Sequence, residues 1–276
     1  MNGKARIACC ALLLCAGAAA SAEDGAIVTV GRTPVKVLPD ATPSDLPIAM
    51  FTGLPEEQLK ALAPEGTVRL WRNVFIFPLG EKRVMIDTGM GTPGSPFPKV
   101  YPRGEKANHP DAILLTHLHA DHIGGLLDGA EARFPECALF LSKPALDHWA
   151  GATGERAEQA QKILKAYEGR IVSFGDGEEI LPGVFARYAP GHTPGHTLFE
   201  TEDLLFVGDL LHGAAIQFEH PDICASFDMD KPVAVTQRKA WLKKVAQSGK
   251  PIAGCHLPYI GKVTEKDEGF TFTEVK

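Results

Sequence analysis

Long apolar runs are absent from this sequence after residue 22. No later stretch reaches the roughly 20 consecutive apolar residues of a membrane-spanning helix, so we expect the mature protein to have no membrane partner. The start of the chain differs, because Lys4 and Arg6 precede an apolar run that ends at Ala20-Ser21-Ala22. This succession is typical of a secretory signal. We expect residues 1–22 to be cleaved off and the mature protein to be periplasmic or secreted.

Cysteine is scarce as well, with six in 276 residues, three of which fall within the signal. One of them, Cys15, would be the attachment site of a lipoprotein, but Leu14 is larger than the small residue usual before such a cysteine. The mature chain keeps Cys137, Cys224 and Cys255, which can form at most one disulfide. The sequence therefore excludes a disulfide-rich scaffold.

Basic runs are also missing. The chain has 28 Lys and Arg against 34 Asp and Glu, a formal net charge of −6, and loss of the signal makes it more negative. Proteins that bind nucleic acids normally present a basic face, so we expect a small-molecule substrate and no nucleic acid partner. A G-x-S-x-G motif is absent too, which leaves a serine hydrolase without support.

What the sequence does contain suits one sizeable globular domain over residues 23–276. The composition is 45% hydrophobic and 22% charged, which is ordinary for a soluble domain of this length. Short β-branched and aromatic runs alternate with helical patterns at residues 154–169 and 230–249. Residues 78–80, Pro-Leu-Gly, predict a hairpin turn, and the Pro-rich residues 34–47 predict an extended arm. The alternation predicts a mixed α/β fold.

The densest group of ligand-type side chains lies in "LLTHLHADHIGG", residues 114–125. His117 and His119 are two apart, so they face the same way at the end of an extended strand. Asp121 and His122 follow where the chain turns, and they can approach from another side. Burying several imidazoles and a carboxylate together is costly unless a cation compensates them. The spacing therefore predicts metal ligands.

Three later apolar runs also end in ligand-type residues. His192 and His196 stand in "GHTPGHT", Asp209 follows "LLFVG", and His256 follows "PIAGC". Ligands gather where the carboxyl ends of strands meet, and nitrogen and carboxylate donors in this number suit two zinc-like ions better than one. Spacing alone lets either His192 or His196 be the ligand. We favour His192, the first after its strand, and expect His196 to brace the loop by hydrogen bonding.

The H-x-H-x-D-H run and these strand ends resemble the metallo-β-lactamase superfamily. The resemblance implies a four-layer αβ/βα sandwich with the metals at one edge of two packed mixed sheets. It further implies that His117, His119 and His192 bind one metal, that Asp121, His122 and His256 bind the other, and that Asp209 bridges them. The Asp87-Thr88-Gly89 turn matches an aspartate that supports the ligand loop in this family.

Finer likeness points to one branch of that superfamily. The segments "GDLLH", "AAIQFEHPDI" and "HLPYIGKV" are similar to methyl parathion hydrolase and its lactonase-like relatives. This implies a hydrolase that uses two divalent ions, most simply Zn²⁺, and a hydroxide shared between them on lactone, ester or organophosphotriester bonds. Asp121 and Asp209 are the expected catalytic carboxylates, with Asp121 helping to carry a proton to the leaving group.

Other activities of the same fold stay open at this point. A β-lactamase is the nearest rival, but the β-lactamases with a similar "GHTPG" segment generally lack the bridging aspartate that Asp209 supplies. An iron persulfide dioxygenase keeps the histidine found here at His119, so only metal analysis separates it. A metal-binding module without catalysis is disfavoured by the complete ligand set.

Some side chains have two interpretations on sequence alone. His212 lines the site or faces solvent, and Cys255 is a thiol near the metals or a small packing residue, the latter favoured. Residues 48–55 and 91–104 form either a pocket rim or exposed loops. The oligomeric state is also open, with a homodimer among the states that the sequence allows.

Overall fold

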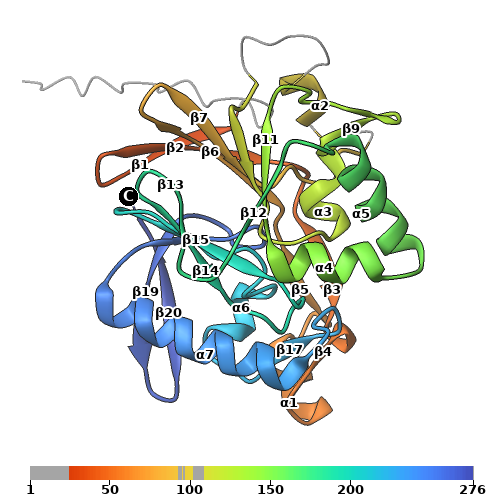
Figure 1. Ribbon diagram of the computed structural model, residues 1–276. Helices are drawn as coiled ribbons and strands as arrows, with labels where there is room; N and C mark the ends of the chain where they lie inside the picture. Colours follow the sequence, from red (N-terminus) through yellow and green to blue (C-terminus); the bar gives the residue numbers. More distant parts are fainter. Residues whose placement is uncertain (1–24, 93–94, 96, 102–108, 276) are drawn as a thin grey trace, which may run out of the picture.

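The computed structural model describes residues 25–92, 95, 97–101 and 109–275. The predicted signal, residues 1–22, and its cleavage site lie outside the described residues, so both stay predictions. Within the described ranges, none of the helices is long and apolar enough to cross a bilayer. Figure 1 shows two stacked sheets with helices on their outer sides.

The first sheet contains seven strands in the described part of the chain, in the order β1-β2-β6-β7-β8-β11-β12. It is mixed, because the pairs from β1 to β7 are antiparallel, whereas β7, β8, β11 and β12 run parallel. The strands are β1 (Ala26–Val30), β2 (Thr33–Pro39), β6 (Asn73–Leu79), β7 (Lys82–Ile86), β8 (Ala112–Leu114), β11 (Ala138–Ser142) and β12 (Ile171–Phe174).

The second sheet also contains seven described strands, in the order β13-β14-β15-β16-β18-β19-β20. Only β16 and β18 are parallel to each other, and the other pairs are antiparallel. The strands are β13 (Glu179–Leu181), β14 (Val184–Tyr188), β15 (Thr197–Glu200), β16 (Leu205–Phe206), β18 (Ile252–Ala253), β19 (Gly261–Lys266) and β20 (Gly269–Glu274).

Helices cover the outer face of each sheet. The helix pair α4 (Lys143–Gly151) and α5 (Glu155–Ala166) lies on the first sheet, and α7 (Lys231–Ser248) lies on the second. The other helices are α1 (Glu56–Leu62), α2 (Phe97–Val100), α3 (Ala120–Ile123), α6 (Ala214–Gln217) and the 3₁₀ turns η1 (Ile48–Met50) and η3 (Gly124–Leu126). The predicted helical patterns at 154–169 and 230–249 are thus confirmed as α5 and α7.

The alternating side chains of β6 contribute to the hydrophobic cores on both faces of the first sheet. Val74 and Ile76 pack with the helix-side cluster that contains Trp149 and Ile163. Phe75 and Phe77 point to the other face and join Phe206 of the second sheet, with ring centroids 5.6 and 5.3 Å away. Because successive residues of a strand face opposite sides, one strand serves both cores. The predicted four-layer sandwich is confirmed.

Short two-stranded ribbons complete the fold beside the sheets. They are β3 (Ser44–Pro47) with β5 (Thr67–Leu70), β4 (Phe51–Thr52) with β17 (Cys224–Ala225), and β9 (Leu127–Asp128) with β10 (Glu131–Ala132). The predicted hairpin is confirmed as β6 and β7, joined at Gly80, which has φ of 60°. Residues 34–47 are extended as predicted, but they are not a free arm, because they form most of β2 and all of β3.

Candidate metal centre

The seven predicted ligands meet at one edge of the two sheets, since each follows the end of a strand. Strand β8 leads to the first ligand run, and its last members lie in the short helix α3. The loop between β14 and β15, the end of β16 and the end of β18 supply the others. The residues brought together are His117, His119, Asp121, His122, His192, Asp209 and His256.

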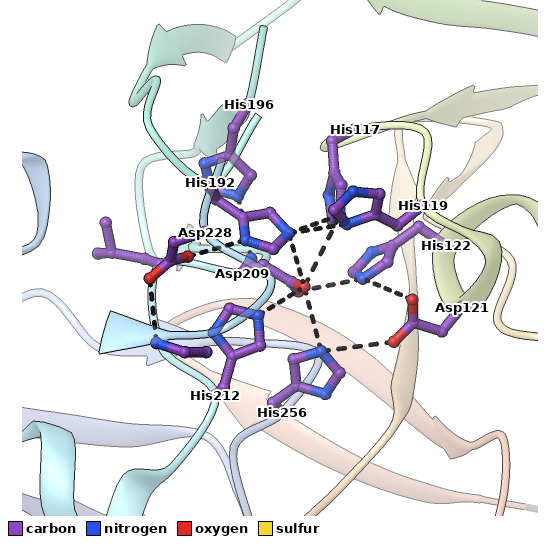
Figure 2. Close-up of polar contacts among 12 residues, drawn as sticks. His117, His119, Asp121, His122, His192, His196, Asp209, His212, Asp228 and His256 are labelled. Atoms are coloured by element: carbon purple, nitrogen blue, oxygen red, sulfur yellow. Dashed lines mark hydrogen bonds and ion pairs between the residues drawn. The ribbon is translucent and has the colours of Figure 1, made fainter. Parts of the chain in front are cut away.

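Asp209 lies at the middle of this group (Figure 2). Its Oδ2 is 3.3 Å from Nε2 of His192 and 3.1 Å from Nε2 of His256, and it is 3.7 Å from Nε2 of His117. Its other oxygen, Oδ1, is 3.0 Å from Nε2 of His122. The carboxylate therefore faces histidines of both predicted metal positions, which is the geometry expected of a bridging ligand.

In the residues that the structure describes, donor atoms within 4.8 Å of one another form two groups of four, beside two groups of three that include His212. One group of four contains His117, His119, His192 and Asp209, and the other contains Asp121, His122, His256 and the thiol of Cys255. These groups of four correspond to the two ligand sets implied by the resemblance. Cys255 was expected to be a small buried packing residue; it is buried, and its sulfur also lies beside the second group.

The polar atoms of the group fit metal ions better than they fit one another. Among the described residues, Nε2 of His119 is buried without a hydrogen-bond partner, and Nε2 of His122 and Oδ1 of Asp209 lie 3.0 Å apart without the geometry of a hydrogen bond. Nε2 of His192 is 3.1 Å from Nε2 of His117 and 2.9 Å from Nδ1 of His119. In a dry site it is costly to crowd three imidazole nitrogens together and to bury polar atoms without hydrogen bonds. A shared cation removes that cost.

The protonation states of the first group already suit a metal. Burial lowers the pKa of His117 well below its usual value, and burial together with His192 lowers the pKa of His119 to about 3. Burial alone would raise the pKa of Asp209, but His122 and His256 hold it well below its usual range. The two histidines are therefore neutral and Asp209 is ionised, which are the forms that coordinate metals.

His122 and His256 behave differently. Burial would lower the pKa of each, yet the nearby carboxylate of Asp209, followed by the neighbouring Cys255, raises both well above the usual histidine value. A metal bound at this second group would displace those protons.

Hydrogen bonds from outside the group orient three of the histidines. Asp87 contacts Nδ1 of His122 at 2.7 Å, in agreement with the support expected from the Asp87-Thr88-Gly89 turn. Asp228 lies 3.0 Å from Nδ1 of His192, and the carbonyl of Trp71 lies 2.7 Å from Nδ1 of His256. Such partners fix the ring and the tautomer of a metal-binding histidine.

Asp228 is a functional residue that sequence reasoning missed. Its second oxygen, Oδ2, accepts hydrogen bonds from Arg238 and from the backbone amide of Ala225, at 3.2 Å each. Asp228 stands only two residues before the helix-capping Asp230. On sequence alone, Asp228 therefore cannot be told apart from an ordinary acidic residue near the start of a helix.

Comparison with known proteins settles the family. The model of the metallo-β-lactamase superfamily matches residues 72–256, more than half of the chain, and this range holds all seven predicted ligands. The chain belongs to the metallo-β-lactamase superfamily.

Solved metallo-β-lactamase-superfamily structures resemble this one over most of their length. AidC, a dizinc quorum-quenching lactonase, is 27% identical with a TM-score of 0.81, over 91% of this chain and 97% of AidC. AbOPH, a hydrolase in the β-lactamase superfamily, is 24% identical with a TM-score of 0.80 over the same shares. The structural neighbours are thus lactonase and hydrolase members of the superfamily.

Curated sequences of the superfamily match over a shorter stretch. Hydroxyacylglutathione hydrolase of Klebsiella pneumoniae is 33% identical over 120 residues, 43% of this chain and 40% of the relative. The enzyme of Photorhabdus laumondii is 39% identical over 102 residues, 37% of this chain and 34% of the relative. The chain therefore spans well under half the length of these relatives.

The metallo-β-lactamase-type centre opens into a cavity of about 280 Å³. Leu46, Leu70 and Phe227 line it with apolar surface, and Arg72 and Arg156 also border it. Residues 48–55, one of the two predicted rim segments, do not line it. They pack beside it, in a core that includes Ile48 and Phe51. The second predicted rim segment is residues 91–104. Of these, residues 93–94, 96 and 102–104 lie outside the described residues.

His212 belongs to this cavity rather than to the solvent-facing surface. It is buried, and its Nε2 lies 3.2 Å from Oδ2 of Asp209. Its ring stacks against that of His256, with centroids 5.1 Å apart. The structure thus selects the first of the two interpretations of His212 that the sequence left open.

Proposed function

We propose that this protein is a dinuclear, metal-dependent hydrolase that acts on lactone and ester bonds, with organophosphotriesters as secondary substrates. The convergence of four of the predicted histidine ligands on the two oxygens of Asp209 carries the proposal. One carboxylate facing two ligand groups suits two ions that share it. The donor set of nitrogen and carboxylate oxygen favours Zn²⁺.

When bound, two divalent ions supply Lewis acidity and a hydroxide nucleophile near neutral pH. The chain's own residues supply a fixed negative charge and hold the histidine rings in position. Asp209 stays ionised at the centre, and Asp228 and Asp87 fix the rings of His192 and His122. Asp121 has the most exposed side chain of the predicted ligand set, at 24%, and it borders the cavity. That placement supports its role in carrying a proton to the leaving group.

Similarity to the dizinc lactonase AidC over nearly the whole of both chains supports lactones as the leading substrates. A second candidate is a thioesterase, which the local identity with hydroxyacylglutathione hydrolases favours. In both reactions a nucleophile attacks a carbonyl carbon and the bond to an alkoxide or a thiolate breaks, with a proton delivered to the departing atom, so one site can serve either.

The test is metal analysis of the purified mature chain together with a hydrolysis panel. The panel contains an acyl-homoserine lactone, an aryl ester, an acyl thioester, a paraoxon-type triester and a cephalosporin. We expect two zinc ions per chain and turnover of the lactone or the esters. Efficient cephalosporin cleavage without turnover of the other substrates would make it a β-lactamase, and stoichiometric iron would favour the persulfide dioxygenase.

We further propose that the substrate is a small molecule and that the protein works in the periplasm or outside the cell. The cavity volume of about 280 Å³ is near the lower end of the range for small-molecule sites. The charged, apolar and A-x-A succession at the start of the chain supports export.

A further inference from the structure

Two arginines border the metal cavity, and neither has an acidic partner among the described residues. Arg72 follows strand β5, and Arg156 is in the first turn of α5. In the part of the chain that the structure describes, neither side chain forms an ion pair or a hydrogen bond. The Nε of Arg72 is buried, so solvent does not satisfy it either.

A shortage of carboxylates does not explain these unpaired side chains. The chain has 34 acidic against 28 basic residues, and several arginines elsewhere are paired. Those pairs are Arg32 with Glu202, Arg69 with Asp45, Arg187 with Glu200 and Arg238 with Asp228. A partly desolvated guanidinium without a partner is costly. Its cost is offset when a ligand brings the anion.

The remaining charges of the cavity do not neutralise the two arginines. The carboxylates of Asp121 and Asp209 face the histidines of the metal centre, and two divalent ions would exceed their charge. Leu46, Leu70 and Phe227 supply the apolar wall. A fitting ligand therefore has an apolar segment between the group at the metals and an anionic end.

We propose that Arg72 is a specificity-determining residue that binds a carboxylate of the substrate, assisted by Arg156. Arg72 is the main contact because it is half-buried, whereas Arg156 is exposed at the cavity border. A guanidinium binds a carboxylate through two parallel hydrogen bonds. The substrate class is thus an anionic lactone, ester or thioester whose acyl part ends in a carboxylate. This inference rests on the proposed hydrolase function.

The kinetic test uses two lactones that differ only in the distal charge, N-adipoyl-homoserine lactone and its methyl ester. For the zinc-loaded wild type we expect kcat/KM to be higher for the acid. Arg72→Gln should lower the acid-to-ester ratio of kcat/KM about tenfold, mainly through KM, because a charged hydrogen bond is lost. Arg156→Gln should lower it less. Arg32→Gln removes the same charge far from the cavity and should leave the ratio unchanged.

A binding measurement separates this inference from the proposed function. The probes are the hydrolysis-resistant γ-lactam analogues of the same acid and methyl ester, titrated into zinc-loaded protein by calorimetry. Tighter binding of the acid that is lost in Arg72→Gln supports the inference even if no lactone is turned over, in which case only the proposed function fails. Equal binding of the two analogues by the wild type overturns the inference, whether or not lactones are cleaved.

Discussion

The backbone amide of Asp209 donates a hydrogen bond to Nε2 of His196, at 3.0 Å. The other ring nitrogen of His196, Nδ1, lies 3.0 Å from the carbonyl of Ala189. His196 therefore ties the loop after β14 to the residue that faces both metal groups, while His192 itself lies among the donor atoms. Two histidines four residues apart in one motif thus have different positions, one among the donor atoms and one that braces the loop.

The first prediction compares these two histidines. His192→Ala should lose the metal of the group that contains His117 and His119, with nearly all activity, because one donor nitrogen is removed. His196→Ala should keep both metals and lose mainly stability or rate. Metal content by elemental analysis of both purified variants checks this. The assignment must be exchanged if His196→Ala empties a site while His192→Ala keeps two ions.

The second prediction concerns the shared carboxylate. Asp209→Ala should bring the metal content below two per chain and reduce turnover with it, because its oxygens face histidines of both groups. Asp147→Ala, an exposed position on α4, is the control and should keep both metals. An unchanged stoichiometry of two in Asp209→Ala would show that this carboxylate does not bridge.

A third prediction concerns Asp228, which orients His192 without belonging to the predicted ligand set. Asp228→Asn should weaken zinc binding about 10- to 100-fold, as loss of a partner behind a metal-bound histidine usually does. Competition with a coloured chelator measures this affinity. Asp230→Asn is a matched control two residues away, since Asn caps a helix about as well as Asp. A lower melting temperature with unchanged zinc affinity would leave Asp228 a purely structural role.

The fourth prediction links pH to the stability of the second sheet. Burial would raise the pKa of Glu200, but its hydrogen bonds with Lys250 and Arg187, at 2.9 and 2.8 Å, lower it below the usual glutamate value. A lowered folded-state pKa contributes stability above the unfolded-state pKa, and that contribution is lost as pH falls through the folded-state value. Glu200→Gln should therefore reduce the free energy of unfolding at neutral pH by about 1 kcal/mol.

The same difference should shrink towards zero in acid, where Glu200 of the wild type is protonated. Urea unfolding of the wild type and of Glu200→Gln at both pH values measures it, with the exposed Glu265→Gln as control. A difference that stays constant with pH would mean that packing, rather than charge, explains the effect.

The fifth prediction concerns export. The mature protein isolated from its native host should begin at Glu23, because Ala20-Ser21-Ala22 matches the small-residue pattern before a signal cleavage site. Intact-mass measurement decides this. Detection of a chain that keeps Met1 to Ala22 outside the cytoplasm would rule out cleavage at this position.

Local patterns in the sequence were enough to predict the helices α5 and α7, the β6–β7 hairpin and the donor run from His117 to His122. Each of these depends on residues close in sequence, whose spacing fixes which side of a strand or helix they share. His192, Asp209 and His256 could also be proposed, because each follows an apolar run and the resemblance assigns them to one centre. The structure adds that histidines of both groups converge on the carboxylate of Asp209.

Only the tertiary structure decided the partners of those residues. Asp228 meets His192 from 36 positions away, and Arg72, just after β5, borders the cavity with no side-chain partner among the described residues. His212 is buried beside Asp209 of the predicted metal centre rather than exposed to solvent. Contacts between residues distant in sequence depend on strand order and on the packing of the two sheets, which local periodicity does not encode.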